Sequence, residues 1–530
     1  MPIVSTKGIN AYTGSFSEKE LKHLLRRTNI GINRQMIQSY SGQTLSQVLN
    51  SILTLSPEPS PPLNYYENQI NPTTYKESNI PYGTTWVNTT PTHPEINFLK
   101  IKSFKSWLIQ NYFKDTTITE KMALFLHSFI PISHDVSDPR FLYFNYKMLR
   151  ANSLGNFKTI IKNTLLDPGM LRYLNGDKNQ KNSPDENLAR ELQELFTLGK
   201  GYSPIYSEDD IKAAAKVLTG YQINNTTATY TFNSTRHDSN NKQFSSFYNN
   251  TIITGKTGTA GEQELDDLLT MIFSKNEVAL HFCRKLYGFF VYYDIDVVVE
   301  ANVIKPLANI FRNSNYEILP VLQALFASEH FYDTDTYGSH IKCPIDYMIG
   351  QFKEMEIAMP DASNIETQYD VYFDVLSYAS VLRQEPYDPP NVSGWEAYYQ
   401  APLMHENWIT TDTIANRNKL SVYLLIGYTK RSFRVQADLI NFTKGFSNPS
   451  DPNILINDAV AFLHTIPANS DLKAYLKTIL LFNQSTESYW TDAWNNHINN
   501  PTDAAKKKIV TDLLMPFYKY IVELSEYQLM

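Results

Sequence analysis

The sequence predicts a mainly α-helical protein, with a multi-helix core of orthogonal or bundle-like packing and a small β-hairpin insertion. Apolar residues recur at helical spacing along most of the chain, and capping signals precede several of these runs. Only one stretch, at about 222–262, alternates as a strand does. With 530 residues, 42% of them hydrophobic, the chain is long enough for two or three packed units and is not disordered.

The first half of the chain divides into two predicted parts and the start of a third. Residues 1–55 form an N-terminal helical segment, in which Ser17 and Glu20 have the spacing of a capping box. Residues 56–94 are rich in Pro and Tyr, and their apolar residues show neither helical nor strand spacing. This predicts a boundary segment that is either a functional loop or an exposed stretch wrapped around the surface. Helical spacing returns at residue 95.

Residues 95–420 are predicted to form a helical core domain. A second capping box, Thr117 with Glu120, begins one of its helices. In the hairpin at about 222–262, we expect residues 227–232 to pair with residues 251–255. Residues 421–530 form a C-terminal helical segment.

Composition narrows the function classes. A net charge of -7 argues against a nucleic-acid binder, which normally carries a basic face. No apolar run is long enough for a transmembrane helix, and the first residues do not resemble a signal peptide, so the chain as written is expected to be soluble and cytoplasmic. Neither Cys283 nor Cys343 belongs to a CxxC motif, and Cys283 is expected in the core.

The segment 183–199 carries the densest charge at helical spacing. Ser183, Pro184 and Glu186 predict its start, and Gly199 predicts a left-handed stop. One face is apolar, and the other carries Glu186, Arg190, Glu191 and Glu194. Two interpretations stay open: a solvated ladder of ion pairs, or a cleft in which Glu191 and Glu194 share a metal or a proton and Arg190 holds an anion.

Several blocks, in a fixed order, resemble a known bacterial family. The run from Glu186 to Gly199 resembles the signature of domain-of-unknown-function family 1800. The other matching blocks are His23–Arg27 with Gly31, Leu149–Phe157, Asp167-Pro168, Ile211–Gly220, His237-Asp238 with Lys242, Arg284–Tyr287, Ile341–Pro344 and Pro389–Trp395. The resemblance covers roughly residues 15–420.

The chain departs from the family pattern at two places. The family often has a Trp-His-x-His-Phe stretch, and here the run is Leu126–Ile130, without the second histidine. In the turn that follows His237-Asp238, Asn240 replaces a glycine, and asparagine tolerates a left-handed backbone.

The resemblance implies no established activity. Members are typically bacterial, often exported, and often encoded beside a second family that resembles sulfatases and alkaline phosphatases. It therefore implies a protein partner from that superfamily.

Two function hypotheses follow. The first is a non-enzymatic interaction or assembly component linked to the cell envelope or secretion. The alternative is a metal-dependent hydrolase that combines the acidic helix face with the His-Asp turn, its metal and any other cofactor being left unassigned. Its candidate catalytic residues are Glu191, Glu194, His237 and Asp238. The candidate ligand-binding residues are Glu186, Arg190, Lys242 and Trp395, although Trp395 also suits a purely packed role in its Pro-Pro loop.

Overall fold

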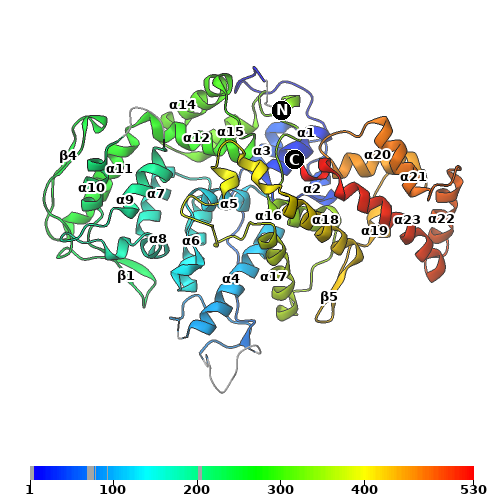
Figure 1. Ribbon diagram of the computed structural model, residues 1–530, viewed down its shortest axis with the longest axis horizontal. Helices are drawn as coiled ribbons and strands as arrows, with labels where there is room; N and C mark the ends of the chain where they lie inside the picture. The colour runs from blue at the N-terminus through cyan, green and yellow to red at the C-terminus, as the bar shows by residue number, and fades with distance from the viewer. Residues whose placement is uncertain (1–4, 68–76, 78, 92, 201–205) are drawn as a thin grey trace.

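Helices dominate the computed structural model, which describes residues 5–67, 77, 79–91, 93–200 and 206–530. The predicted fold class, mainly α with small hairpins, is confirmed. Figure 1 shows an elongated molecule, with helices α9 to α11 and the first hairpins at one end and helices α19 to α23 at the other. No helix in the described part of the chain combines the length and the apolar character that a membrane span requires.

The N-terminal and central helices surround the middle of the molecule. They are α1 (Glu18–Thr28), α2 (Arg34–Tyr40), α3 (Leu45–Ile52), α4 (Pro94–Lys114), α5 (Thr119–Phe129), α6 (Pro139–Ala151), α7 (Phe157–Leu166), α8 (Pro168–Tyr173), α16 (Pro344–Glu354), α17 (Ile365–Val381) and α18 (Thr411–Ile426). Near the centre, α4 lies against α17 and α5 lies against α6.

Short polar residues explain where several helices begin. Ser17 forms the predicted capping box with Glu20 at the start of α1. The predicted box of Thr117 and Glu120 is wrong, because the Asp115 carboxylate accepts the Thr117 and Glu120 N–H groups, at 3.1 and 2.8 Å. The Glu120 side chain instead accepts from Tyr146 and Arg150, at 2.6 and 2.7 Å.

The end that carries the hairpins combines short strands with helices. Its elements are α9 (Asn187–Glu191), η4 (Leu192–Thr197), α10 (Glu208–Val217), β1 (Tyr221–Asn224), β2 (Thr229–Phe232), β3 (Lys242–Gln243), β4 (Ile252–Ile253) and α11 (Glu264–Phe273). The predicted strand pairing is wrong: β1 pairs with β2 and β3 pairs with β4, so residues 222–262 hold two antiparallel pairs. Each strand pairs with its near neighbour in sequence, which closes a shorter loop than the predicted pairing.

Helix α12 (Asn276–Phe290) joins this end to the centre. It packs against α14 (Lys305–Asn313), α5 and η4. The chain between α12 and the central helix α16 forms α13 (Val297–Val299), the π-helical η7 (Glu300–Ile304) and α15 (Ile318–Phe326). Cys283, on α12, is fully buried as expected.

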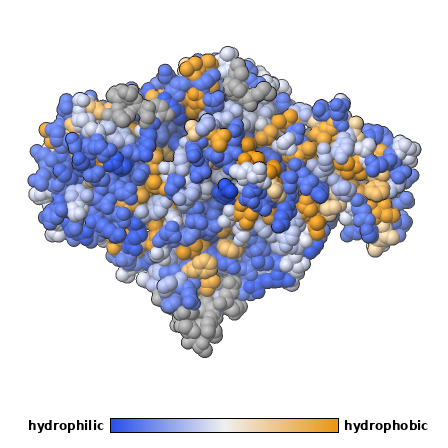
Figure 2. Space-filling view, in the orientation of Figure 1, coloured by the Kyte–Doolittle hydropathy of each residue, from blue (hydrophilic) through white to orange (hydrophobic). Residues whose placement is uncertain are grey.

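The C-terminal segment forms the other end of the molecule. It contains β5 (Tyr428–Lys430), β6 (Phe433–Val435), α19 (Leu439–Lys444), α20 (Pro452–Leu463), α21 (Ser470–Leu480), α22 (Ser488–Ile498) and α23 (Ala504–Glu523). After α23 the chain returns to the centre, where Leu529 bridges to Ile341. On the face in Figure 2, the hairpin end is mainly hydrophilic, and apolar side chains gather toward the centre and the C-terminal end.

The described part of the Pro/Tyr-rich segment packs onto helices α4 and α17. Tyr65, Tyr66 and Trp86 are fully buried. The Tyr65 ring stacks on Tyr369 of α17 at 4.7 Å, and the Trp86 indole N–H donates to Ser103 of α4 at 3.0 Å. These aromatic residues therefore contribute to the core.

Candidate functional site

The charged helix contains a π-helical turn. α9 continues directly into η4, in which Leu198 N–H donates to the Gln193 carbonyl, five residues earlier, at 3.0 Å. The wider turn changes the predicted faces: Leu188, Leu192 and Phe196 are buried in the core, whereas Leu195 borders a cavity. Because π-turns are frequent at functional sites, this segment is a candidate on geometry alone.

The start of this helix differs from its prediction. α9 begins at Asn187, so its N-cap is Glu186 and not the predicted Ser183, and the predicted capping box of Ser183 with Glu186 does not form. Asp185 instead accepts the Asn187 N–H at 2.9 Å. The predicted stop is confirmed, since Gly199 has a φ of 83°.

The acidic face of the helix is organised around Arg190. Its guanidinium lies 3.4 Å from Glu186, 3.4 Å from Glu194 and 2.7 Å from Glu208. The hydrogen bonds and charges of Glu208 and Glu194 raise the Arg190 pKa despite partial desolvation. Glu194 is also paired with Lys200 at 2.6 Å. Burial, and then the charge of Glu194, raise the pKa of Glu191, which is itself buried.

The His-Asp turn lies in a separate buried cluster, here called the His237 cluster (His237, Lys242 and Glu264). His237 Nε2 lies 3.1 Å from one Glu264 oxygen, and Lys242 Nζ lies 2.5 Å from the other. His237 Nδ1 donates to the Thr219 carbonyl at 2.9 Å. Burial opposes ionisation of Glu264, but hydrogen bonds from His237, Lys242 and the Lys256 N–H lower its pKa below the ordinary value.

Asp238 and Asn240 complete this turn. Asp238 accepts the Asn240 N–H at 2.8 Å, a local hydrogen bond typical of an Asx turn. Asn240 is not among the residues with a left-handed backbone. Lys242 also donates to the Asp238 carbonyl, so both residues are held within the turn.

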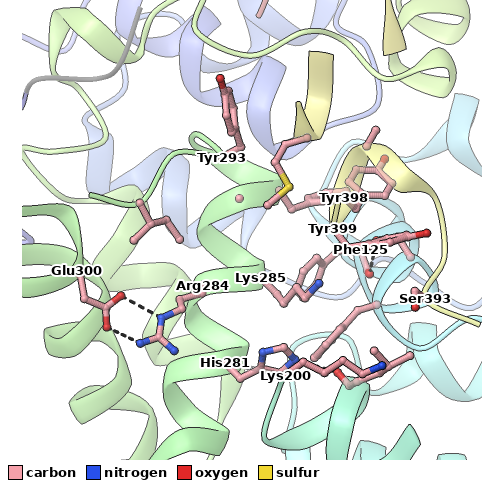
Figure 3. A pocket seen from close by; sticks show the side chains of 18 of the residues that line it. Phe125, Lys200, His281, Arg284, Lys285, Tyr293, Glu300, Ser393, Tyr398 and Tyr399 are labelled. Atoms are coloured by element: carbon pink, nitrogen blue, oxygen red, sulfur yellow. Dashed lines mark hydrogen bonds and ion pairs between the residues drawn. The ribbon is translucent and has the colours of Figure 1, made fainter. Parts of the chain in front are cut away.

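A cavity of about 1010 Å³ lies between α5, η4, α12 and the loop around Trp395. Figure 3 shows side chains from these elements pointing into it. Its lining residues are Phe125, Ser128 and Phe129 from α5; Glu194, Leu195 and Lys200; His281, Arg284, Lys285, Gly288 and Phe289 from α12; Tyr293, Ile295, Asp296, Val297, Glu300 and Lys305; and Ser393, Ala397, Tyr398, Tyr399 and Met404. Aromatic rings from three separate segments therefore face one space.

Gly199 and Gly394, which both have a left-handed backbone, allow two loops to approach the helices of the cavity wall closely. A Cβ on Gly199 would lie 2.7 Å from His281 Nδ1, and a Cβ on Gly394 would lie 2.6 Å from the Ser128 carbonyl oxygen. Any other residue would also be strained at these positive φ angles. Each glycine thus brings a loop against a helix of the cavity wall.

His281 is held as a neutral ring beside the cavity. Its Nε2 donates to the Leu195 carbonyl at 2.9 Å, which fixes the tautomer. Burial, and then the charge of Lys285, lower the His281 pKa to about 3. The hydrogen bond joins α12 to the π-helical turn.

Charges around the cavity are mostly paired. Arg284 forms two hydrogen bonds to Glu300, at 3.0 and 2.6 Å, and Lys200 pairs with Glu194. Asp296 caps α13 by accepting the Val298 and Val299 N–H groups. Lys285 has no ion-pair or hydrogen-bond partner among residues 5–67, 77, 79–91, 93–200 and 206–530, and burial lowers its pKa to about 8.

A possible metal-ligand set lies outside the cavity. In the described part of the chain, His134, Glu385 and Asp388 form the one group of three His, Cys, Asp or Glu residues with potential ligand atoms within 4.8 Å of one another. Lys105 Nζ already lies 2.5 Å from Glu385 and 3.1 Å from His134 Nδ1. An ammonium group among these atoms takes the position and the charge role of a cation, so the set does not fit a metal ion without its displacement.

The side-chain interactions place most of the predicted site residues in two sets. Glu186, Arg190 and Glu194 lie together, and His237, Asp238 and Lys242 lie together around Glu264. Glu194 alone among the predicted residues lines the cavity. Trp395 is buried, with its ring 5.6 Å from that of His127.

Sequence reasoning did not select the polar residues of α12. His281, Arg284, Lys285 and Gly288 lie at i, i+3, i+4 and i+7, which places them on one face of a helix that is otherwise strongly apolar. That polar stripe was the available signal. Two of these residues, Arg284 and Lys285, also belong to the block Arg284–Tyr287 that resembles the family pattern.

Fold and site together define a mainly helical protein built around an aromatic-lined cavity. The chain belongs to the family described as protein of unknown function (DUF1800), whose model matches residues 23–529. The match therefore includes the C-terminal segment, beyond the region of the resemblance seen in the sequence. Searches of curated proteins and of solved structures gave no match.

Proposed function

We propose that this protein is a non-enzymatic binding protein whose cavity between α5, η4 and α12 holds a small molecule with an apolar, planar body. The observation that carries the proposal is the convergence of separate sequence blocks on one space. The blocks around 125–129, 186–200, 284–287 and 389–395 each contribute lining residues. The volume, about 1010 Å³, suits a drug-sized ligand.

Gly288 supports a binding role, because a glycine at this position lowers the stability of the helix and packing does not require it. Gly288 lies in the last turn of α12, where glycine is less favourable than alanine, by up to roughly 1 kcal/mol. An added Cβ would have no heavy atom within 4 Å, so packing does not require a glycine here. The missing side chain instead widens the cavity.

The walls favour binding over catalysis. The Ser128 hydroxyl donates to the Phe125 carbonyl at 2.8 Å and has no activating base in the described structure. His281 Nε2 is hydrogen-bonded to the Leu195 carbonyl, and the Glu194 carboxylate forms ion pairs with Arg190 and Lys200. The proposal keeps the non-enzymatic hypothesis from the sequence and assigns it to a small ligand.

The test uses N-phenylnaphthylamine, a neutral probe that fluoresces in apolar sites. We expect saturable binding by the unmodified protein and by Gly288→Ala, and strongly reduced binding by Gly288→Leu, whose side chain would extend into the cavity. Thermal denaturation checks that the two variants are equally folded. Absence of saturable binding, or equal binding by Gly288→Ala and Gly288→Leu, would contradict the proposal.

A further inference from the structure

We infer that Lys285 is an anchor for the head group of an organic anion, so that the ligand of the cavity is an amphiphile with one acidic group and an apolar, planar body. This inference rests on the proposed binding function and adds the chemical class of the ligand. It begins from the charges that face the cavity.

The charge balance around the cavity leaves an excess of cations. Arg284 is neutralised by Glu300 and Lys200 by Glu194, and Asp296 is engaged at the start of α13. Lys285 and Lys305 are then the lining cations for which the described residues supply no carboxylate. Lys305 is exposed, whereas Lys285 is half-buried.

The two neighbouring cations of α12 point in different directions. In Figure 3, Arg284 extends toward Glu300, while Lys285 extends to the opposite side, into the space between His281 and Tyr399. Because it is directed away from Glu300, its ammonium group cannot share that carboxylate. The Lys285 side chain therefore faces the cavity with no counter-charge from the described residues.

A shielded ammonium group without a counter-charge is unfavourable. Burial disfavours its charged form, as its lowered pKa of about 8 shows. An anion that entered the cavity would supply the missing charge and charge-assisted hydrogen bonds. Lys285 is thus positioned to gain a partner when a ligand binds.

The aromatic residues that line the cavity indicate the chemistry of the rest of the ligand. Phe125, Phe129 and Phe289 offer apolar surface and stacking faces. The Tyr399 hydroxyl accepts from Asn391 at 2.9 Å, and the Tyr398 hydroxyl accepts from Gln384 at 2.9 Å, so both rings are held in place. A rigid aromatic wall beside the Lys285 ammonium group suits a carboxylate, sulfonate or phosphate ester carried on an apolar body.

Two probes with the same body separate the head group from the rest. Anilinonaphthalene sulfonate has the ring system of N-phenylnaphthylamine with an added sulfonate group. We expect Lys285→Met to weaken binding of the sulfonate probe by about tenfold or more, the effect of a lost hydrogen bond between charged groups. Binding of the neutral probe is expected to change by less than about twofold. Lys507→Met, which removes an exposed cation of α23 that does not line the cavity, serves as the control and is expected to leave both affinities nearly unchanged.

The outcomes distinguish the two proposals. If Lys285→Met binds the sulfonate probe as tightly as the unmodified protein, or if Lys507→Met has the same effect as Lys285→Met, the anchor role is wrong. The proposal that the cavity binds a small molecule would then still stand. If neither probe responds to Gly288→Leu, the binding function itself is wrong. If sulfonate binding falls tenfold in Lys285→Met alone, the inference is supported.

Discussion

The His237 cluster and the cavity around Lys285 show two opposite ways in which this chain shields charge. In the first, Glu264 accepts from Lys242 and faces His237, and all three residues are buried. In the second, Lys285 has no partner among the described residues and faces a space of about 1010 Å³. The comparison teaches that a fully paired buried cluster serves the fold, whereas an unpaired shielded charge beside a cavity is available to a ligand.

The largest expected effect comes from breaking the paired cluster. Glu264→Gln keeps the size of the side chain but leaves Lys242 as a buried, unneutralised charge. We expect the free energy of unfolding to fall by about 3–5 kcal/mol, as for other broken buried pairs. Urea titration followed by circular dichroism measures the change.

Arg190→Met is the matched control for this variant. It removes the centre of a partly exposed set of ion pairs, and we expect a loss of about 1 kcal/mol or less. A loss for Arg190→Met equal to that for Glu264→Gln would contradict the distinction between paired core and surface ladder.

Gly199→Ala should have the next largest effect. The new Cβ would meet His281 Nδ1 at 2.7 Å, and φ is 83°. We expect a loss of about 1–3 kcal/mol from strain and overpacking. Gly42→Ala isolates the strain, because Gly42 has a φ of 76° and open space around its Cβ position. The same urea titration should give a smaller loss for Gly42→Ala, and equal losses would show that the His281 contact is unimportant.

The pH dependence of anion binding sharpens the role of Lys285. Its pKa of about 8 means that the ammonium form dominates below that pH and is lost above it. Affinity for anilinonaphthalene sulfonate should therefore fall by up to about tenfold per pH unit above roughly pH 8. Charged or titratable groups nearby are His281 and Arg284 on the same helix, Glu194 and Lys200 from the η4 side, and Asp296, Glu300 and Lys305. Fluorescence titrations at several pH values test this, and Lys285→Met should lack the decrease.

The smallest expected effect is a gain in the free energy of unfolding. Gly288→Ala replaces a helical glycine at a position with open space, and should stabilise the protein by about 0.5–1 kcal/mol. A shift of the urea transition to higher concentration measures it. Destabilisation would mean that the helix needs the glycine for packing, against the interpretation given for the cavity.

Local signals explain why some features could be predicted from the sequence. The Ser17–Glu20 box and the Gly199 stop depend on neighbouring residues, and both are confirmed. The Thr117–Glu120 box is wrong because Asp115 caps the segment while Tyr146 and Arg150 bind Glu120, and these last partners lie on another helix. A pattern of neighbouring residues cannot show hydrogen-bond partners that lie far away in the sequence.

The site depended still more on contacts between distant segments. Glu194 and His237 come from neighbouring blocks, yet Glu264 holds His237 in its own cluster while Lys200 pairs with Glu194. The cavity arises where α5, η4, α12 and the loop around Trp395 meet, and no single motif contains it. The polar stripe of α12 is visible in the sequence. It indicates that one face of this helix is not packed in the core, but it does not indicate that α5, η4 and the loop around Trp395 lie opposite that face.

The π-helical turn at Leu192–Thr197 has a consequence for changes in chain length. A π-turn contains one residue more than the corresponding α-helical turn. Deleting one residue there would restore regular helical bonding instead of breaking the helix, and the side chains that follow would keep their orientation. A deletion at this point is therefore well tolerated by the helix itself, and its effect would fall on the cavity wall, to which Glu194 and Leu195 both belong.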